Sequence, residues 1–345
     1  MSPADPPPHA TPKAAPVPDA VPVPPPASHA APIESVALAV HEPFDGAGLA
    51  TWFAARAVPG VEAVIGGAWT RAVALRHGAA VLHADLTAPR RPGRLDVRLG
   101  LEDPRDREEA VALTRHLLDL DAEPQTVDAH LARTIPALAG SVADRPGVRV
   151  PGTPSLVEAL LWAIVGQQIT VAHTLDQMTR ATDAVAAPLP PRLQRDGVTR
   201  LPADPVAAAT APEWYRGPEA RRRALRALAQ AAPEITEAAA ATRRALAGPA
   251  PASGSDAVAR LRTRLLALPG VGPWTADYAL IRGLRCSDLV PAGDVALLAG
   301  ARRLGLLGPE DPLTALLPAL APAAPWRTHA VMHLWHAAPV RPGRR

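Results

Sequence analysis

The chain has 345 residues and a formal net charge of +3, from 36 lysine and arginine side chains against 33 aspartate and glutamate side chains. This length predicts two or three globular units, and the small positive excess favours nucleic-acid binding only weakly. No apolar run reaches the roughly eighteen residues of a membrane span, and the first residues lack the pattern of a secretory signal. The single cysteine, Cys286, excludes an internal disulfide and a four-cysteine metal site. We therefore expect a cytoplasmic protein with no membrane partner.

Residues 1–35 hold 12 of the 42 prolines, mixed with alanine and valine. Proline removes the backbone donor that helices and sheets need, so the pattern predicts a disordered tail. A partner-docking arm is the alternative to a solubilising or incidental tail.

Residues 36–102 alternate apolar and polar side chains in short runs. This period of two predicts strands with one buried face, and we expect them at Val36–His41, Ala72–Arg76, Ala80–Leu86 and Arg94–Leu99. Residues 46–57 have the spacing of a helix. The segment therefore predicts a small N-terminal α+β domain with a mostly antiparallel sheet.

After Asp103 the apolar spacing is that of helices throughout. We expect them over residues 108–120, 155–170, 219–232, 256–268, 274–283, 295–304 and 326–336. Ser155 followed by Glu158 is typical of a capping box, and the proline-rich residues 186–205 predict a connection. The fold class is therefore α+β, with a mainly helical region over residues 103–345.

One stretch, residues 265–278, combines two helices with a Leu-Pro-Gly-Val-Gly turn. Two glycines in four residues permit a tight turn, and backbone amides beside a helix N-terminus can bind a phosphate. We expect Gly270, Val271, Gly272 and Thr275 to contact DNA backbone, without reading base sequence. An ordinary turn between packed helices is the alternative.

This string resembles the helix-hairpin-helix signature of the base-excision DNA glycosylases. A Gly/Pro-rich loop that ends in Asp294 follows Trp274 by 20 residues, as that superfamily requires. The resemblance narrows to the bacterial 3-methyladenine DNA glycosylase II, or AlkA-like, family and runs from about residue 40 to the C-terminus. It includes the segments 53–58, 163–167 and Pro325-Trp326-Arg327. It implies two helical subdomains flanking an active-site cleft.

The resemblance implies that Asp294 is the catalytic carboxylate. A carboxylate beside the sugar can stabilise positive charge on C1′ or activate water, and the sequence leaves both roles open. An N-cap of the following helix is a compatible structural role. Bifunctional relatives carry a lysine where this chain has Trp274, and the single lysine here is Lys13. The expected enzyme is therefore monofunctional and leaves an abasic site.

A flipped base needs aromatic side chains to stack on. Trp274 and Tyr278 lie four residues apart on one helix face, and the resemblance adds Trp326 and Trp52. Such rings attract electron-poor alkylated purines. Plain core packing is the alternative interpretation of these aromatics.

The vacated stack needs a side chain as a wedge. The resemblance places it at Gln168, with the neighbouring Ile169 as an alternative or sharing the role, and we expect Gln167, Gln168 and Ile169 all to contact DNA. Relatives have leucine at the wedge position, and Val295 stands where an aromatic residue is familiar. Both departures leave the range of lesions open.

The family also implies a monovalent cation, Na⁺ or K⁺, held by the backbone carbonyls of Leu266, Leu268 and Val271; no other cofactor is required. The partner is double-stranded DNA containing damaged bases, and we expect a nucleoid-associated monomer. His329 and His333 have a zinc-like spacing, but we interpret them as partly buried or solvated helix histidines. Arg221–Arg223 are interpreted as a solvated helix face, with a phosphate contact as the alternative. The basic C-terminus is expected to be frayed and to add nonspecific DNA affinity. A lesion-binding protein without catalysis and a glycosylase for deaminated or oxidised bases stay open as alternatives.

Overall fold

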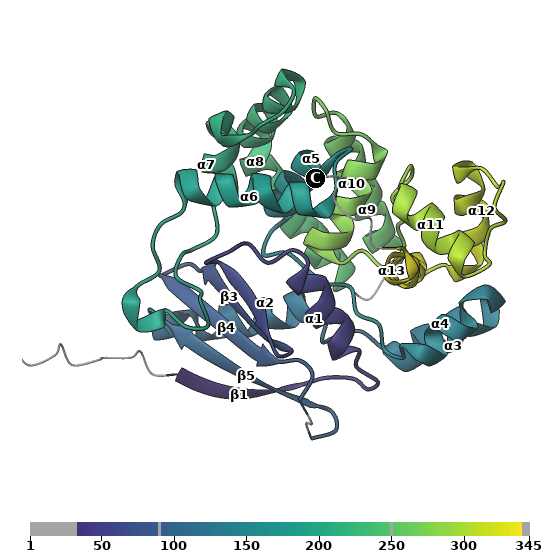
Figure 1. Cartoon of the computed structure of the whole chain (residues 1–345), viewed down its shortest axis with the longest axis horizontal. Coiled ribbons are helices and arrows are strands. Elements are labelled where there is room, and N and C mark those ends of the chain that lie inside the picture. The colour runs from purple at the N-terminus through teal and green to yellow at the C-terminus, as the bar shows by residue number, and fades with distance from the viewer. Residues whose placement is uncertain (1–32, 89–90, 249–250, 340–345) are drawn as a thin grey trace, which may run out of the picture.

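The structure, a computed structural model, describes residues 33–88, 91–248 and 251–339 (Figure 1). The predicted tail before Ile33, the single lysine and the arginines after residue 340 lie outside the described residues. Within the described ranges, no helix is both long and apolar enough to cross a membrane.

An antiparallel sheet of five strands forms the N-terminal part. The strands are β1 (Ile33–Ala39), β2 (Glu62–Ile65), β3 (Ala68–Ala74), β4 (Ala79–Asp85) and β5 (Arg94–Leu101), in the order β1-β5-β4-β3-β2. The predicted antiparallel sheet is thus confirmed. β1 begins inside the segment predicted as a tail, and β2 was not expected, since its four residues are too few to show a period. β2 is one edge strand of the sheet and pairs with β3, where Glu62 lies opposite Arg71.

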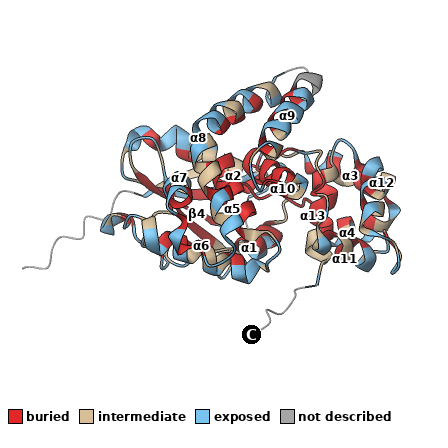
Figure 2. Ribbon diagram, turned by 90° about the horizontal axis from the view of Figure 1, so that it is seen from above, coloured by how far each residue is buried: buried red, intermediate tan, exposed pale blue. Residues whose placement is uncertain are grey.

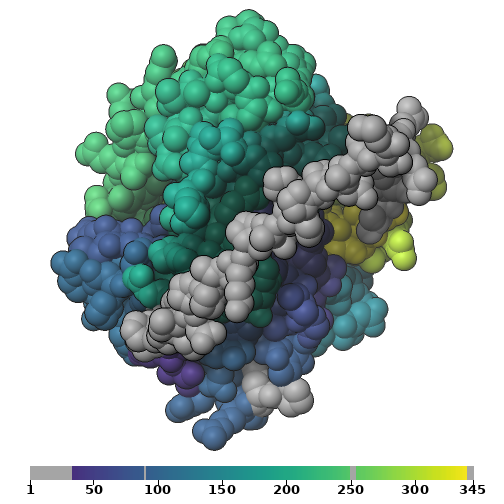
Figure 3. Space-filling view, turned by 60° about the vertical axis from the view of Figure 1, so that its left-hand side comes forward, coloured from purple at the N-terminus to yellow at the C-terminus, as the bar shows by residue number. Residues whose placement is uncertain are grey.

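Both faces of the sheet are covered. One face packs its apolar residues against α1 (Gly46–Ala54) and α2 (Arg107–Leu118). The other face packs against the proline-rich connection, through Leu189, Leu193 and Val198. Figure 3 shows the sheet lobe in blue directly below the green helical lobe. The connection predicted at residues 186–205 therefore also covers this face of the sheet.

The helical region forms two groups with separate cores. The first group holds α5 (Leu156–Gly166), α6 (Val171–Val185), α7 (Pro205–Thr210), α8 (Glu219–Leu246), α9 (Pro251–Leu266) and α10 (Pro273–Leu284). The second holds α3 (Pro124–Thr134), α4 (Ala139–Asp144), α11 (Val295–Arg303), α12 (Leu316–Leu320) and α13 (Arg327–Ala337). In Figure 2, α8 and α9 lie side by side, with buried faces turned toward each other. The predicted α+β, mainly helical fold class is confirmed.

Two helix ends differ from the sequence-based expectation. α8 continues to Leu246 through Pro233, because the buried stripe of Ala232, Ile235 and Ala239 continues past the proline and offsets the lost backbone bond. α5 ends at Gly166, four residues early, and a new N-cap at Thr170 starts α6. The intervening residues are therefore a loop.

The predicted capping box at Ser155 is half formed. The Ser155 hydroxyl accepts a hydrogen bond from the Glu158 N–H at 3.0 Å. The Glu158 carboxylate instead pairs with Arg71 on β3 at 2.6 Å. A tertiary ion pair has thus replaced the local contact, and it ties α5 to the sheet.

α13 buries the histidines that had a zinc-like spacing. His333 is 0% exposed and its Nδ1 lies 2.9 Å from the Ser141 hydroxyl. No cluster of three His, Cys, Asp or Glu with metal-binding geometry occurs in the part of the chain that the structure describes. Both histidines are core residues, more deeply buried than the partly buried or solvated positions expected of them. Cys286 is also buried, which raises its thiol pKa to about 12 and excludes it as a thiolate nucleophile near neutral pH.

The same burial predicts acid sensitivity. Burial lowers the pKa of His333 to about 3 and that of His336 to about 4. Below an unfolded-state pKa of about 6.5, the unfolded chain therefore binds protons that the folded chain does not. Above pH ~6.5 the two histidines do not lower the free energy of unfolding. Below it, each lowers the free energy of unfolding by up to ~1.4 kcal/mol per pH unit, until the pH reaches the folded-state pKa of that histidine. We expect the thermal midpoint to fall steeply between pH 6.5 and 4.5.

The check is thermal melting over that pH range for three proteins. His336→Gln should have a shallower slope than the unmodified chain. His173→Gln changes an exposed histidine on α6 and serves as the control. Equal slopes in all three would contradict the assignment.

Candidate functional site

The predicted hairpin joins α9 and α10. Gly270 has φ = 77° and lies against α8, where an added Cβ would stand 2.7 Å from the Ala224 Cβ. Both features require glycine. Gly272 is the N-cap of α10. No acceptor among the described residues takes the N–H of Gly270 or Gly272, so both amides are free at a helix N-terminus.

Two other residues that the sequence placed at this contact point inward. Val271 is 6% exposed, and its N–H donates to the Leu268 carbonyl at 3.1 Å. Thr275 is 2% exposed, and its hydroxyl accepts from Gln167. The amides of Gly270 and Gly272 are therefore free to bind a phosphate, and the backbone N–H of Thr275 likewise has no acceptor among the described residues.

Gln167 connects the hairpin to the loop between α5 and α6. Its side-chain amide donates to the Gly270 carbonyl at 2.8 Å and to the Thr275 hydroxyl at 2.7 Å. Its own backbone carbonyl accepts from Arg221 at 2.7 Å. Gln167 thus fixes the loop to the hairpin and does not project into solvent. The Arg221 guanidinium is also engaged, contrary to the interpretation of that residue as a solvated surface cation.

Gln168, the next residue, is held in an unusual conformation. It is exposed and has φ = 64°, a left-handed value rare for a residue with a Cβ. Ile169 beside it is 38% exposed. The clamped neighbour Gln167 explains how this strained, projecting loop persists.

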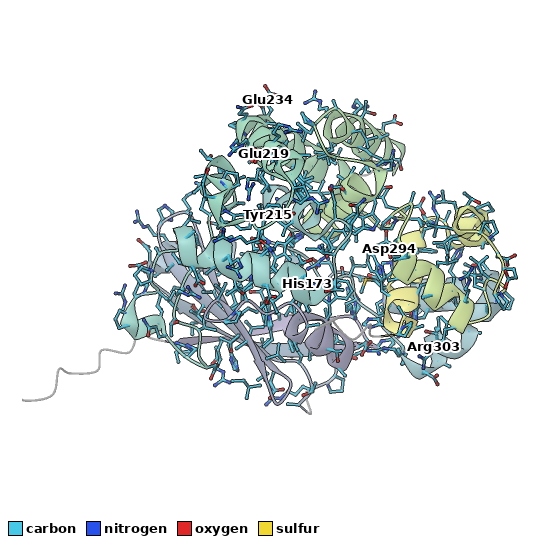
Figure 4. All side chains as sticks on the ribbon, turned by 45° about the horizontal axis from the view of Figure 1, so that its top comes forward. His173, Tyr215, Glu219, Glu234, Asp294 and Arg303 are labelled. Atoms are coloured by element: carbon cyan, nitrogen blue, oxygen red, sulfur yellow. The ribbon has the colours of Figure 1, made fainter. Side chains whose placement is uncertain are left out.

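Asp294 is the N-cap of α11, placed by a turn in which Gly293 has φ = 87° (Figure 4). Its Oδ1 accepts from the N–H groups of Ala296 and Leu297 at 2.8 and 3.1 Å. Its Oδ2 accepts from the indole N–H groups of Trp274 at 2.9 Å and Trp335 at 3.2 Å. Four donors hold one carboxylate at a helix N-terminus, where negative charge is stabilised. The capping role and a chemical role are thus compatible.

Four aromatic rings form one cluster, two of which, Trp274 and Trp335, contact this carboxylate. Trp274 and Tyr278 stack with centroids 5.2 Å apart and planes 16° apart. The Trp335 ring lies edge-on to Tyr278, with centroids 5.9 Å apart, and is tilted by 43° against Trp52, with centroids 5.6 Å apart. The cluster joins three helices, α1, α10 and α13, to Asp294 on α11. It therefore lies where the sheet lobe and both helical groups meet.

Trp326, which the resemblance placed in the pocket, lies outside this cluster. Its ring contacts His130 of α3 at 4.8 Å, edge-on. Within the described residues, none of its ring contacts or hydrogen bonds reaches Asp294 or Trp274. Sequence reasoning missed Trp335, nine residues further on. No pattern in the sequence singled Trp335 out; in the structure Met332, on the same helix face, is fully buried against the sheet lobe.

Two guanidinium groups lie behind the rings. The Arg282 Nη1 donates to the Tyr278 hydroxyl at 3.0 Å. The Arg56 Cζ lies 3.6 Å from the centroid of Trp52, a cation–π contact. Burial raises the pKa of the Tyr278 phenol, but the charges of Arg282 and Arg56 outweigh it and hold that pKa below its usual value. Arg56 lies in the segment 53–58 of the resemblance, but neither arginine was expected at the site, because each acts through a contact that depends on the fold.

Comparisons with known proteins show which sequences and structures this chain resembles. The family model of the AlkA N-terminal domain matches residues 35–155. The chain is 34% identical over 301 residues to a Mycobacterium tuberculosis protein described as a probable bifunctional transcriptional activator/DNA repair enzyme AlkA, covering 87% of this chain and 56% of that protein. It is 27% identical to DNA-3-methyladenine glycosylase 2 of Escherichia coli K12, covering 85% and 94%. The chain thus spans little more than half of the mycobacterial relative.

A solved structure supports the same fold. The 3-methyladenine DNA glycosylase from Archaeoglobus fulgidus superposes with a TM-score of 0.67 at 16% identity, covering 87% of this chain and 97% of that one. At this identity the likeness concerns the arrangement of helices and sheet alone.

Proposed function

We propose that the chain is a member of the AlkA-like family of helix-hairpin-helix DNA glycosylases and that it excises alkylated bases from double-stranded DNA. The observation that carries the proposal is Asp294, held by four N–H donors at the edge of a four-ring aromatic cluster. The enzyme acts as a monomer on nucleoid DNA in the cytoplasm. The lesions are of the 3-methyladenine and 7-methylguanine type.

The reaction breaks the bond between C1′ and the base nitrogen. The bond electrons leave with the base, and positive charge builds on the sugar. The Asp294 carboxylate stabilises that charge and orients the water that adds to C1′. The proton of that water passes to the carboxylate or to solvent. The product is an abasic site.

The residues present restrict the reaction to water attack. A lyase step needs an amine nucleophile, and Trp274 stands at the position next to Asp294 where such an amine would act. No lysine occurs in the described ranges, because the single lysine of the chain is Lys13. The enzyme is therefore monofunctional.

DNA is held at two linked places. The free amides of Gly270 and Gly272 bind a phosphate, and Gln168 or Ile169 fills the stack that the flipped base leaves. The rings of Trp52, Tyr278 and Trp335, with Trp274, receive that base.

A monovalent cation, Na⁺ or K⁺, fits the hairpin. The Leu266 and Val271 carbonyls accept no hydrogen bond from the described residues, and the Leu268 carbonyl accepts only one. Carbonyl oxygens with spare lone pairs suit a hard cation. Bound there, the cation would favour the nearby phosphate.

Base release from methylated genomic DNA, identified by chromatography, tests the proposal. We expect released alkylpurines and an intact strand until alkali is added. Competition with DNA containing deaminated or oxidised bases then orders the lesions. Tight binding to lesion DNA with no released base would favour the lesion-binding alternative.

Gln167 offers a test of the link between the hairpin and the wedge loop. Gln167→Ala removes two hydrogen bonds, each worth about 0.5–1.5 kcal/mol, that hold Gln168 in its projecting conformation. We expect base release to slow about tenfold and the fluorescence change of a 2-aminopurine beside the lesion to shrink.

Gln177→Ala is the matched control. Gln177 also makes two side-chain hydrogen bonds to backbone, both to Arg216, away from the hairpin. Equal slowing in both variants would show that the effect comes from general destabilisation.

A further inference from the structure

One face of α10 contacts a carboxylate at one end and carries a guanidinium group at the other. Trp274, Tyr278 and Arg282 follow at intervals of four residues and therefore lie on one face, about 12 Å from first to last. At the first end, the Trp274 indole N–H contacts the Asp294 carboxylate. At the other, the Arg282 guanidinium contacts the Tyr278 hydroxyl at 3.0 Å.

The Arg282 charge has no hydrogen-bonded carboxylate partner within the described residues. The residue is 6% exposed. Its other hydrogen bonds go to the carbonyls of Pro151 at 2.6 Å and Gly152 at 3.2 Å. Its Cζ also lies 5.1 Å from the Trp52 centroid and 5.8 Å from the Tyr278 centroid. All these partners are uncharged, so no hydrogen-bonded carboxylate neutralises the positive charge of Arg282.

Arg56 adds a second cation on the same side. Its Nη1 donates to the Trp52 carbonyl at 3.3 Å, and its guanidinium lies flat against the Trp52 ring. Its charge also acts on the Tyr278 hydroxyl. Two rings of the aromatic cluster, Trp52 and Tyr278, thus each lie beside a guanidinium group.

The nearby carboxylates are already engaged. Glu62 accepts from the Trp69 indole at 2.6 Å and pairs with Arg71 at 3.4 Å. Glu158 pairs with Arg71 at 2.6 Å. Together with Arg56 and Arg282, the group holds three guanidiniums and at most two carboxylate charges. Burial also raises the pKa of Glu62, which favours its neutral form. An excess positive charge therefore remains on the base side of the rings.

We propose that Arg282, through the Tyr278 hydroxyl, makes the base side of the pocket electropositive and so sets the charge of the leaving bases that the enzyme favours. This inference rests on the proposed function. Arg282 is a positioning residue, because it acts through Tyr278. The pocket is then polarised along the bond that breaks, with Asp294 on the sugar side and the arginines on the base side.

The chemistry of the leaving base gives this polarity a consequence. When the C1′–N bond breaks, both bond electrons go to the base. A cationic base such as 7-methylguanine leaves as a neutral molecule, whereas a neutral purine lesion such as hypoxanthine leaves as an anion that water then protonates. Fixed positive charge stabilises the second transition state more than the first. Arg282 therefore assists neutral lesions selectively.

The test measures single-turnover excision of 7-methylguanine and hypoxanthine from matched duplexes by the full chain. Because Arg282 also anchors the 151–152 backbone, Arg282→Met is paired with Tyr278→Phe, which removes only the hydroxyl. We expect the ratio of hypoxanthine to 7-methylguanine excision to fall about tenfold in each variant. Arg282→Lys, which keeps the charge, should recover most of that ratio.

A spectroscopic readout separates charge from structure. The chain has two tyrosines, so an alkaline ultraviolet titration of the unmodified protein and of Tyr278→Phe isolates the Tyr278 phenol. Its pKa should rise in Arg282→Met. An unchanged ratio of the two rates, or an unchanged Tyr278 pKa, overturns the inference. Failure of the unmodified protein to release either base overturns the proposed function itself, and the inference with it.

Discussion

Asp294→Asn should lower the rate of base release by at least about a thousandfold while DNA binding persists. Asparagine keeps the shape of the side chain and caps helices as well as aspartate does. It can still accept from the Ala296 and Leu297 N–H groups, so α11 should keep its N-cap. It loses the negative charge, and its amide NH2 cannot accept from the indole N–H groups of Trp274 and Trp335. The measurement is single-turnover release of alkylated bases, with binding followed by fluorescence anisotropy.

The control for this variant separates the cap from the charge. Asp294→Ala removes both, and it should also lower the thermal midpoint, because an N-cap contributes about 0.5–2 kcal/mol. Asp294→Asn keeps the cap and should therefore melt at a higher temperature than Asp294→Ala. Substantial base release by Asp294→Asn would contradict the catalytic assignment.

Trp335→Ala should slow base release by about a hundredfold. The substitution removes a ring from the cluster, where stacking on a base is worth about 1–3 kcal/mol. It also removes the indole N–H that donates to Asp294 at 3.2 Å, a bond worth roughly 0.5–1.5 kcal/mol. Trp335→Phe keeps a ring and loses only the donor, so its rate should lie between those of the unmodified chain and Trp335→Ala. Single-turnover kinetics on one alkylated duplex measure all three proteins.

Trp326→Ala is the matched control for Trp335→Ala. Both residues belong to the C-terminal segment, but the Trp326 ring contacts His130, away from the carboxylate. We expect its rate to stay within about threefold of the unmodified chain. A larger loss from Trp326→Ala than from Trp335→Ala would show that the pocket forms around the residue that the sequence motif suggested.

Trp326 and Trp335 show which features of the site a local sequence motif can predict and which it cannot. The Pro-Trp-Arg string around Trp326 is a motif, and a motif shows a resemblance without showing where a ring points. Trp335 enters the site because α13 crosses α11 closely: a Cβ on Gly300 would stand 2.0 Å from the Leu334 carbonyl. That crossing is a packing outcome between distant segments. No window of sequence around Trp335 contains it.

Gln167 shows the same limit. The sequence placed it at the DNA surface because it precedes the wedge position. The structure turns its amide onto the hairpin 103 residues away. Hydrogen-bond partners at such separations depend on the fold, because many chain segments offer a backbone carbonyl and tertiary packing alone selects one.

By itself, the sequence determined the features that depend on neighbouring residues. Alternation gave the antiparallel sheet and helical spacing gave most helices, since side-chain direction follows from backbone period. The Gly-Val-Gly turn and the 20-residue spacing gave the hairpin and Asp294, because glycines and a capping aspartate act locally. Tertiary structure alone decided that Trp335 joins the aromatic cluster beside Asp294, that Gln167 ties the α5–α6 loop to the hairpin and that Arg282 bonds to Tyr278. Each of these depends on helices brought together by burial of apolar surface, which is non-directional and leaves no local pattern of contacts in the chain.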